Sequence, residues 1–224
     1  MEKTIQEKFW QSNFGKDYIK RNYYTNKALN VFYLNNFGIT RADINAEFLK
    51  NLKINNLLEV GCNVGNQLSL LQSQGFKNLY GMDISPLAVE FSKKRTKNIN
   101  VILGSALDIP FKDAYFDLVF TSGVLIHISL KNMAAAMKEI YRTSSRYIFG
   151  YEYFSEKYEA INYRGHKDRL WKGNFPQMYL NLFPDLRLVK EKRLKFKANG
   201  SSGKNGRREN ELLSTVFLLK KIKT

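Results

Sequence analysis

The chain is poor in the residues that cross-link or anchor a protein. Its 224 residues include one cysteine, Cys62, which excludes an internal disulfide framework and a multi-cysteine metal site. Its two histidines and scattered acids show no ligand spacing, so we predict no metal. No apolar run reaches the roughly 18–20 residues that span a bilayer, and the opening MEKTIQEKFW lacks the apolar segment of a signal peptide. We expect a cytoplasmic protein without a membrane span.

Negative charge is also scarce. The formal net charge is +16, and residues 187–224 hold 12 Lys or Arg against 3 Asp or Glu. Three interpretations fit this excess: lysine on solvated faces of a chain rich in Asn, Ile, Tyr and Phe, an anionic small ligand, or nucleic acid. Composition alone leaves all three open.

A regular alternation of strand and helix patterns begins after residue 56. Strands are expected at Leu57–Val60, Asn78–Met82, Ile99–Leu103, Phe116–Phe120 and Arg146–Tyr153. Helices are expected at Gly65–Ser73, Pro86–Thr96 and Leu130–Arg142; Gly75 ends the first and Ser85 caps the second. This order indicates an α/β fold with a parallel sheet and right-handed crossovers.

The N-terminal 50 residues form a polar-aromatic pattern typical of helices. Phe14, Tyr18 and Tyr24 lie near helical spacing, and Gly15 is a possible break. A later helix is expected over Arg41–Lys50, capped by Thr40. We predict that this region covers the sheet.

The C-terminal part of the chain departs from the alternation. Residues 186–196 and 212–222 look like two strands with no helix between them, so we expect an antiparallel hairpin at the sheet edge. The linker at 198–210 is rich in Gly, Ser and charge, and it is expected to be exposed and mobile.

A glycine-rich turn follows the first predicted strand, in the sequence LLEVGCNVGN. Gly61 and Gly65 let backbone amides approach a ligand, and Asn63 tolerates a left-handed backbone better than most residues. Asp83 lies 24 residues after Glu59, at the end of the next strand, where a carboxylate can accept both hydroxyls of a ribose. These features indicate a nucleotide-like ligand, although a dinucleotide enzyme shares them.

Two further motifs narrow the ligand. GSALDIPF at 104–111 resembles the third motif of class I methyltransferases, whose loop flanks adenine, with Ser105 in place of the usual acid. AYFDLVFTSGVLIHI at 114–128 resembles their strand-four motif, which lies beside the methionine part of the cofactor. The chain therefore resembles class I methyltransferases, which implies S-adenosyl-L-methionine as cofactor and S-adenosyl-L-homocysteine as product.

The resemblance implies a Rossmann-like fold with a seven-stranded, mostly parallel sheet and an antiparallel last strand. A helical cap at 1–50 and a cofactor-binding domain at 51–224 are expected to form one compact unit. Tyr18, Arg21 and Asn22 share a helical face that either closes over the cofactor, with Arg21 meeting its carboxylate, or only packs on the sheet. Cys62 is expected to be a small buried residue. The predicted cofactor-binding residues are Tyr18, Arg21, Asn22, Glu59, Gly61, Cys62, Asn63, Gly65, Asp83, Ile84, Ser105, Ala106, Thr121 and Ser122.

Three stretches, FWQSNFGKDYIKRN, TSGVLIHIS and YRGHKDRLWKGNF, together resemble methylases associated with pseudaminic acid biosynthesis in bacterial surface-glycan genes. This resemblance implies a small anionic acceptor: a sugar, a sugar nucleotide or a phosphorus-containing capsule precursor. In the last stretch, arginines can clamp a carboxylate or phosphate and aromatic rings can stack on a sugar or base. A solvated basic loop anchored by Trp171 is the alternative. The predicted acceptor-binding residues are Tyr163, Arg164, His166, Arg169 and Trp171.

Methyl transfer is an in-line displacement from a sulfonium, so the enzyme mainly positions donor and acceptor. A general base is needed only where the acceptor must lose a proton. The predicted catalytic residues are His127 after strand four, His166 in the acceptor stretch and Glu152 at the end of strand five. A purely structural role for His127 is equally compatible with its position.

Two rival functions are open at this point. An RNA methyltransferase would use the basic surface, but TSGV stands where nucleic-acid methyltransferases carry an Asn-Pro-Pro-aromatic motif, which disfavours nucleic acid. A non-catalytic scaffold in a biosynthetic complex would keep the cofactor motifs without turnover.

Overall fold

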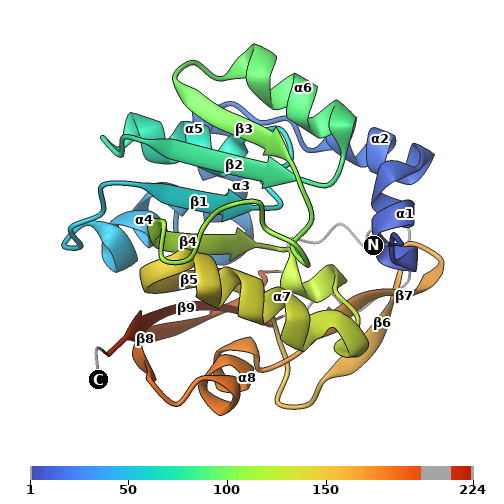
Figure 1. Ribbon diagram of the computed structural model, residues 1–224. Helices are drawn as coiled ribbons and strands as arrows, with labels where there is room; N and C mark the ends of the chain where they lie inside the picture. The colour runs from blue at the N-terminus through green and yellow to red at the C-terminus, as the bar shows by residue number, and fades with distance from the viewer. Residues whose placement is uncertain (1, 198–212, 223–224) are drawn as a thin grey trace.

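Seven strands form one twisted sheet in the computed structural model, which describes residues 2–197 and 213–222 (Figure 1). They are β1 (Leu57–Val60), β2 (Leu79–Asp83), β3 (Ile99–Leu103), β4 (Phe116–Ser122), β5 (Ser144–Phe154), β8 (Leu186–Lys195) and β9 (Leu213–Lys221). Their order is β3-β2-β1-β4-β5-β9-β8. The first five pair in parallel, and β9 is antiparallel to both β5 and β8. The predicted mostly parallel sheet with an antiparallel last strand is confirmed.

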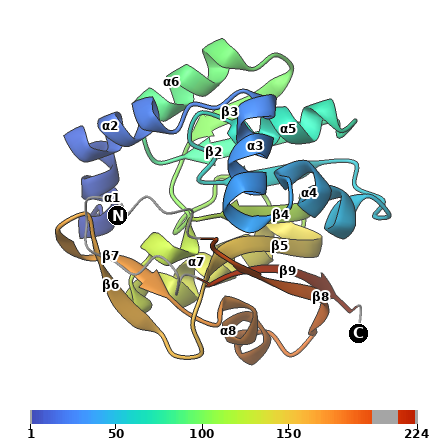
Figure 2. The same ribbon diagram turned by 180° about the vertical axis from the view of Figure 1, so that it is seen from behind.

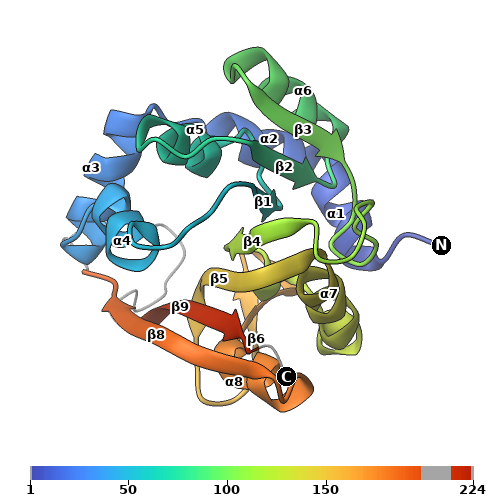
Figure 3. The same cartoon turned by 60° about the vertical axis from the view of Figure 1, so that its left-hand side comes forward.

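Helices cover both faces of the sheet, because side chains alternate between the faces along each strand. In β1, Leu57 contributes to one apolar cluster, and Leu58 and Val60 contribute to another. The first face is covered by α3 (Asn26–Phe37), α4 (Arg41–Leu49), α5 (Asn66–Ser73) and α6 (Pro86–Arg95) (Figure 2). The second is covered by α7 (Leu130–Thr143) and α8 (Phe175–Leu182), as Figure 3 shows from the side.

The N-terminal helices α1 (Ile5–Gln11) and α2 (Asn13–Arg21) lie near the carboxyl ends of the parallel strands (Figure 1). The predicted break at Gly15 is wrong: Gly15 lies inside α2, and Ser12 ends α1 and caps α2. Glycine is required at this position for close packing, because a Cβ would lie 1.8 Å from the carbonyl oxygen of Trp10. The helix expected from Thr40 is confirmed, since the Thr40 hydroxyl accepts a hydrogen bond from the Asp43 N–H.

A β-hairpin occupies the stretch that the sequence suggested as a loop after strand five. β6 (Glu159–Tyr163) and β7 (His166–Lys172) pair in antiparallel fashion. Arg164 and Gly165 form the two-residue turn with φ of 51° and 87°, as a type I′ hairpin turn requires. The hairpin lies beside α1, where Gln6 donates a hydrogen bond to the carbonyl oxygen of Asp168 (Figure 1).

The C-terminal strands pair in the predicted antiparallel hairpin, and β9 inserts between β5 and β8. The predicted linker at 198–210 and the predicted strand position Leu212 lie outside the described residues. In the part of the chain that the structure describes, no helix is both long and apolar enough to cross a membrane.

Candidate cofactor and acceptor site

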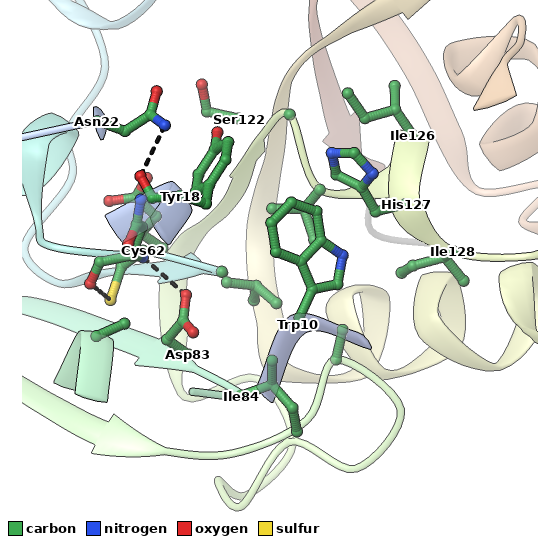
Figure 4. Close-up of a pocket in the computed structure, with 18 of the residues that line it drawn as sticks. Trp10, Tyr18, Asn22, Cys62, Asp83, Ile84, Ser122, Ile126, His127 and Ile128 are labelled. Atoms are coloured by element: carbon green, nitrogen blue, oxygen red, sulfur yellow. Dashed lines mark hydrogen bonds between the residues drawn. The ribbon is translucent and has the colours of Figure 1, made fainter. Parts of the chain in front are cut away.

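The carboxyl ends of β1, β2, β4 and β5 border a cavity of about 390 Å³. The sheet changes its winding direction between β1 and β4, because β1 leads to β2 on one side and β3 leads to β4 on the other. Parallel sheets bind ligands outside such a switch point. Side chains of α1 and α2 complete the cavity wall, and Figure 4 shows Trp10 between Asp83 and His127.

The turn after β1 presents backbone to the cavity. Gly61, Asn63 and Gly65 have φ of 73°, 47° and 74°, in the left-handed region that suits glycine and asparagine. A Cβ on Gly61 would lie 2.4 Å from Val124 Cγ2, so a larger residue would push the turn away from the loop after β4. Gly61, Cys62 and Asn63 line the cavity, whereas Gly65 caps α5 behind them.

Asp83 holds this turn to the end of β2. Its two carboxylate oxygens accept hydrogen bonds from the N–H groups of Asn63 and Ser85, both at 2.8 Å. Burial raises the pKa of Asp83, and these two hydrogen bonds act in the opposite direction. Each carboxylate oxygen offers a second acceptor site, so the group can still accept ribose hydroxyls.

Glu59 provides a second acid on the cavity wall. Its side chain is buried, and its Oε2 has no hydrogen-bond partner among the described residues. Burial raises the pKa of Glu59 well above its ordinary value, and the Arg41 charge acts against this. An orphaned acceptor next to an open-backbone turn fits a ligand that donates hydrogen bonds, as the ammonium group of S-adenosyl-L-methionine does. The residues present therefore fit that cofactor.

The loop after β3 places Ser105 and Ala106 on the cavity, together with Ile84 after β2. Ser105 replaces the acid that is usual at this position of the motif, and a carboxylate from α1 lies beside it. The hydroxyl of Ser105 donates a hydrogen bond to the carboxylate of Glu7. Despite partial burial, the pKa of Glu7 is lowered by its hydrogen bonds with Ser105 and Thr4, so Glu7 is ionised at pH 7.

The cap reaches the cavity through Tyr18 of α2 and through Asn22, which follows the helix as its C-cap, opposite Ser122 at the end of β4 (Figure 4). Arg21 is not brought to the cavity wall. It is exposed, and its guanidinium carbon lies 5.8 Å from the centre of the Phe14 ring. The predicted contact of Arg21 with the cofactor carboxylate therefore has no geometric support.

Another arginine lies near this end of the cavity. Arg41 of α4 is fully buried and donates a hydrogen bond to the Ser122 hydroxyl at 3.3 Å. Its guanidinium also lies over the ring of Tyr151 at 4.9 Å. Thr121, by contrast, is buried inside β4 and does not line the cavity.

His127 belongs to a short 3₁₀ helix, η1 (Leu125–His127), and Glu152 to β5. The Nδ1 atom of His127 lies 2.6 Å from the carbonyl oxygen of Arg169, so we assign the proton to Nδ1 and leave Nε2 as an acceptor. Burial lowers the pKa of His127 to about 4. Burial raises the pKa of Glu152 to about 7, and its carboxylate accepts the N–H groups of Val124 and Ile126.

Aromatic rings extend from Tyr18 toward the other end of the cavity. The Trp10 ring centre lies 4.6 Å from that of His127, 5.0 Å from that of Tyr18 and 6.4 Å from that of Tyr163. Sequence reasoning missed Trp10 and Glu7. The i, i+4 spacing of Trp10, Phe14 and Tyr18 was a usable signal, and so was the Thr-x-x-Glu capping box that contains Glu7.

The remaining predicted acceptor residues do not line the cavity. Arg164 and His166 are exposed at the turn of the β6–β7 hairpin, and Arg169 is half-buried on β7. Trp171 is buried, with its ring stacked 6.2 Å from that of Tyr158, so it anchors the hairpin in the core.

The sequence itself is similar to known proteins over part of its length. Residues 58–146, which carry the turn, Asp83 and the strand-four motif, match a family of methyltransferase domains. Over these residues the chain is therefore similar to a methyltransferase domain. A phosphoethanolamine N-methyltransferase of Plasmodium falciparum is 22% identical over 143 residues, which are 58% of this chain and 53% of that protein. The chain thus spans about half the length of this curated relative.

Solved structures share the fold of this chain. Magnesium protoporphyrin IX methyltransferase from Synechocystis PCC 6803, with bound S-adenosylhomocysteine, superposes with a TM-score of 0.67 at 16% identity, over 99% of this chain and 100% of that one. Geranyl diphosphate C-methyltransferase from Streptomyces coelicolor A3(2) gives a TM-score of 0.62 at 11% identity, over 81% and 77% of the two chains. At these identities the likeness establishes the fold.

Proposed function

We propose that this protein transfers a methyl group from S-adenosyl-L-methionine to a small anionic acceptor. One observation carries the proposal: the same cavity is lined by Glu59 and Asp83 at one end and by Trp10, His127 and Tyr163 at the other. A donor held at Asp83 and an acceptor held beside the rings would therefore meet inside one cavity, as an in-line displacement requires.

The anionic character of the acceptor is supported by the cations around the hairpin. Arg164 lies at the turn between β6 and β7, next to the cavity-lining Tyr163, and Lys167 and Arg169 lie on β7. The curated relative is named for phosphoethanolamine, a phosphate-bearing acceptor. Bacterial surface-glycan or capsule synthesis is the proposed setting, on the sequence resemblance alone, and a cytoplasmic location stays a prediction.

The cofactor would supply a methyl group on a sulfonium, and the chain's own residues would position it. Asp83 would accept ribose hydroxyls, and the turn at Gly61–Gly65 would let the methionine part approach the backbone closely, because Gly61 has no side chain. His127 is neutral at pH 7, so its Nε2 can accept a proton from an acceptor hydroxyl or amine. Glu152 is engaged by backbone N–H groups and would mainly hold the η1 loop in place.

Calorimetric titration with S-adenosyl-L-homocysteine, wild type beside Asp83→Ala, tests the cofactor part. We expect micromolar binding that is lost in the variant, followed by methyl transfer to a phosphorylated or carboxylated small molecule rather than to bulk RNA. Turnover on RNA with steep salt dependence would replace the small acceptor with nucleic acid. Cofactor binding without turnover on any acceptor class would favour the scaffold function, and absence of cofactor binding would refute the proposal.

A further inference from the structure

Arg41 of α4 is a fully buried cation beside the cavity. Among residues 2–197 and 213–222 it takes part in no ion pair. Burial raises the pKa of Glu59, the acid whose charge acts on Arg41, and so favours the uncharged carboxyl group. The rings of Tyr33, Phe149 and Tyr151 lie within 6 Å of the guanidinium and compensate its charge only in part. A buried cation without an ionised partner is costly, so an anion that enters the cavity would be stabilised there.

Two hydroxyl groups stand between Arg41 and the cavity. The Nη1 atom of Arg41 donates one hydrogen bond to Tyr33 Oη at 3.2 Å and another to Ser122 Oγ at 3.3 Å. Both hydroxyl-bearing residues line the cavity, Tyr33 from α3 and Ser122 from the end of β4. Figure 4 shows Ser122 near Tyr18 and Asn22 of the cap. The charge of Arg41 therefore reaches the cavity through these two hydroxyls.

The contacts with Arg41 fix the direction in which both hydroxyls can donate. A guanidinium has donors and no acceptor, so each hydroxyl oxygen accepts a proton from it and keeps its own O–H. Within the described ranges, neither the Tyr33 nor the Ser122 hydroxyl donates a hydrogen bond to another group. Asn45 Oδ1 accepts a hydrogen bond from Arg41 Nε at 3.2 Å and holds the guanidinium in place. The two O–H groups are thus available to a ligand, and the positive charge behind them strengthens them as donors.

We infer that Tyr33 and Ser122 form a paired-donor site for a carboxylate or phosphate, with Arg41 as the positioning residue that orients and polarises both hydroxyls. This inference rests on the proposed function and adds Tyr33 and Arg41 to the residues that recognise its ligands. Two ligands of that reaction carry an oxygen pair of this kind. One is S-adenosyl-L-methionine, through the carboxylate of its methionine part, and the other is the anionic acceptor.

Matched ligands test the cofactor as the source of the anion. S-adenosyl-L-homocysteine and its decarboxylated analogue, S-adenosyl-3-thiopropylamine, differ only in the carboxylate, and calorimetry measures both. If this carboxylate occupies the site, Ser122→Ala and Tyr33→Phe should each weaken S-adenosyl-L-homocysteine about tenfold, the loss of one hydrogen bond to a charged group, and leave the analogue unchanged. Tyr23→Phe is the matched control, because it removes an exposed hydroxyl outside the cavity and should change neither ligand.

Inorganic phosphate tests the acceptor as the source of the anion. The protein is first saturated with S-adenosyl-L-homocysteine and is then titrated with phosphate. If the acceptor's anion occupies the site, Ser122→Ala and Tyr33→Phe should weaken phosphate about tenfold, while S-adenosyl-L-homocysteine and its analogue bind as they do to the wild type. If the cofactor carboxylate already fills the site, phosphate binding should not respond to either variant.

Arg41→Met, which removes the charge at similar length, tests the positioning role. It should weaken the same ligand that the hydroxyl variants weaken, and it should change the ratio between S-adenosyl-L-homocysteine and its analogue when the cofactor carboxylate is that ligand. If this variant does not fold, the two hydroxyl variants still decide whether the site exists. Equal weakening of S-adenosyl-L-homocysteine and its analogue, or no weakening of any probe, would overturn the site. Absence of S-adenosyl-L-homocysteine binding in the wild type would instead refute the proposed function.

Discussion

Ser105 and Glu7 lie 98 residues apart in the chain, and the Ser105 hydroxyl donates a hydrogen bond to the Glu7 carboxylate. The loop of Ser105 is the one that flanks adenine in the family the sequence resembles, and it lacks the usual acid. Glu7 is the third residue of α1 and also completes the capping box with Thr4. The first turn of the N-terminal helix therefore brings a carboxylate to the place where the loop lacks one.

Glu7→Gln should weaken S-adenosyl-L-homocysteine binding about tenfold, because the carboxylate is the stronger acceptor for the adenine amino group. S-inosylhomocysteine, which carries a carbonyl in place of that amino group, should bind the wild type weakly and lose little in the variant. Calorimetry with both ligands measures the difference. Thr4→Ala is the matched control, since it breaks the capping box and leaves Glu7 in place; equal losses for both ligands would contradict the adenine contact.

Asn63 should tolerate glycine better than alanine. Its φ of 47° lies in the left-handed region, which costs alanine about 1 kcal/mol or more and costs glycine nothing. We expect Asn63→Ala to lower the free energy of unfolding in urea by about 1 kcal/mol and Asn63→Gly to leave it nearly unchanged. Both variants keep the N–H that Asp83 accepts, so similar losses in the two would assign the effect to the Asn63 side chain.

Glu152 should make the fold less stable as pH rises. Burial raises its pKa from 4.5 to about 7, so between these values the folded state holds a proton that the unfolded state has released. Its contribution to the free energy of unfolding therefore falls across pH 4.5–7, by at most about 1.4 kcal/mol per pH unit, and is constant above pH 7. Urea unfolding at several pH values should show a shallower dependence in Glu152→Gln. The exposed Glu156→Gln is the control, and identical slopes for Glu152→Gln and wild type would refute the assignment.

Gly15→Ala should loosen the cap. Its Cβ would overlap the carbonyl oxygen of Trp10, so α1 must move away from α2. We expect a loss of about 1–3 kcal/mol in stability, with a changed tryptophan emission as Trp10 shifts. Thermal unfolding and fluorescence measure both effects, beside Lys16→Ala on the exposed side of the same helix. Unchanged emission and stability would mean that the α1–α2 contact is not close in solution.

The parallel pairing of the first five strands and the position of the glycine-rich turn after β1 were determined by the sequence itself. Local patterns carry this information: Gly61 and Gly65 follow a buried apolar strand, Asp83 ends the next strand, and strand–helix alternation dictates parallel pairing. The same local reasoning placed His127 and Glu152 at the edge of the sheet that carries the site. His127 comes just after the fourth predicted strand, and Glu152 lies at the end of the fifth.

Only the tertiary structure decided which side chains line the aromatic end of the cavity. Trp10, His127 and Tyr163 meet because α1 docks beside the β6–β7 hairpin, and contacts between residues so distant in sequence leave no local pattern. The same docking leaves Arg21 and Arg164 outside the cavity wall and brings Glu7 to Ser105. The periodicity that predicts strands and helices depends on residues close together in the chain. The charge of a cavity depends on which side chains, distant in the chain, the packed fold brings to its wall.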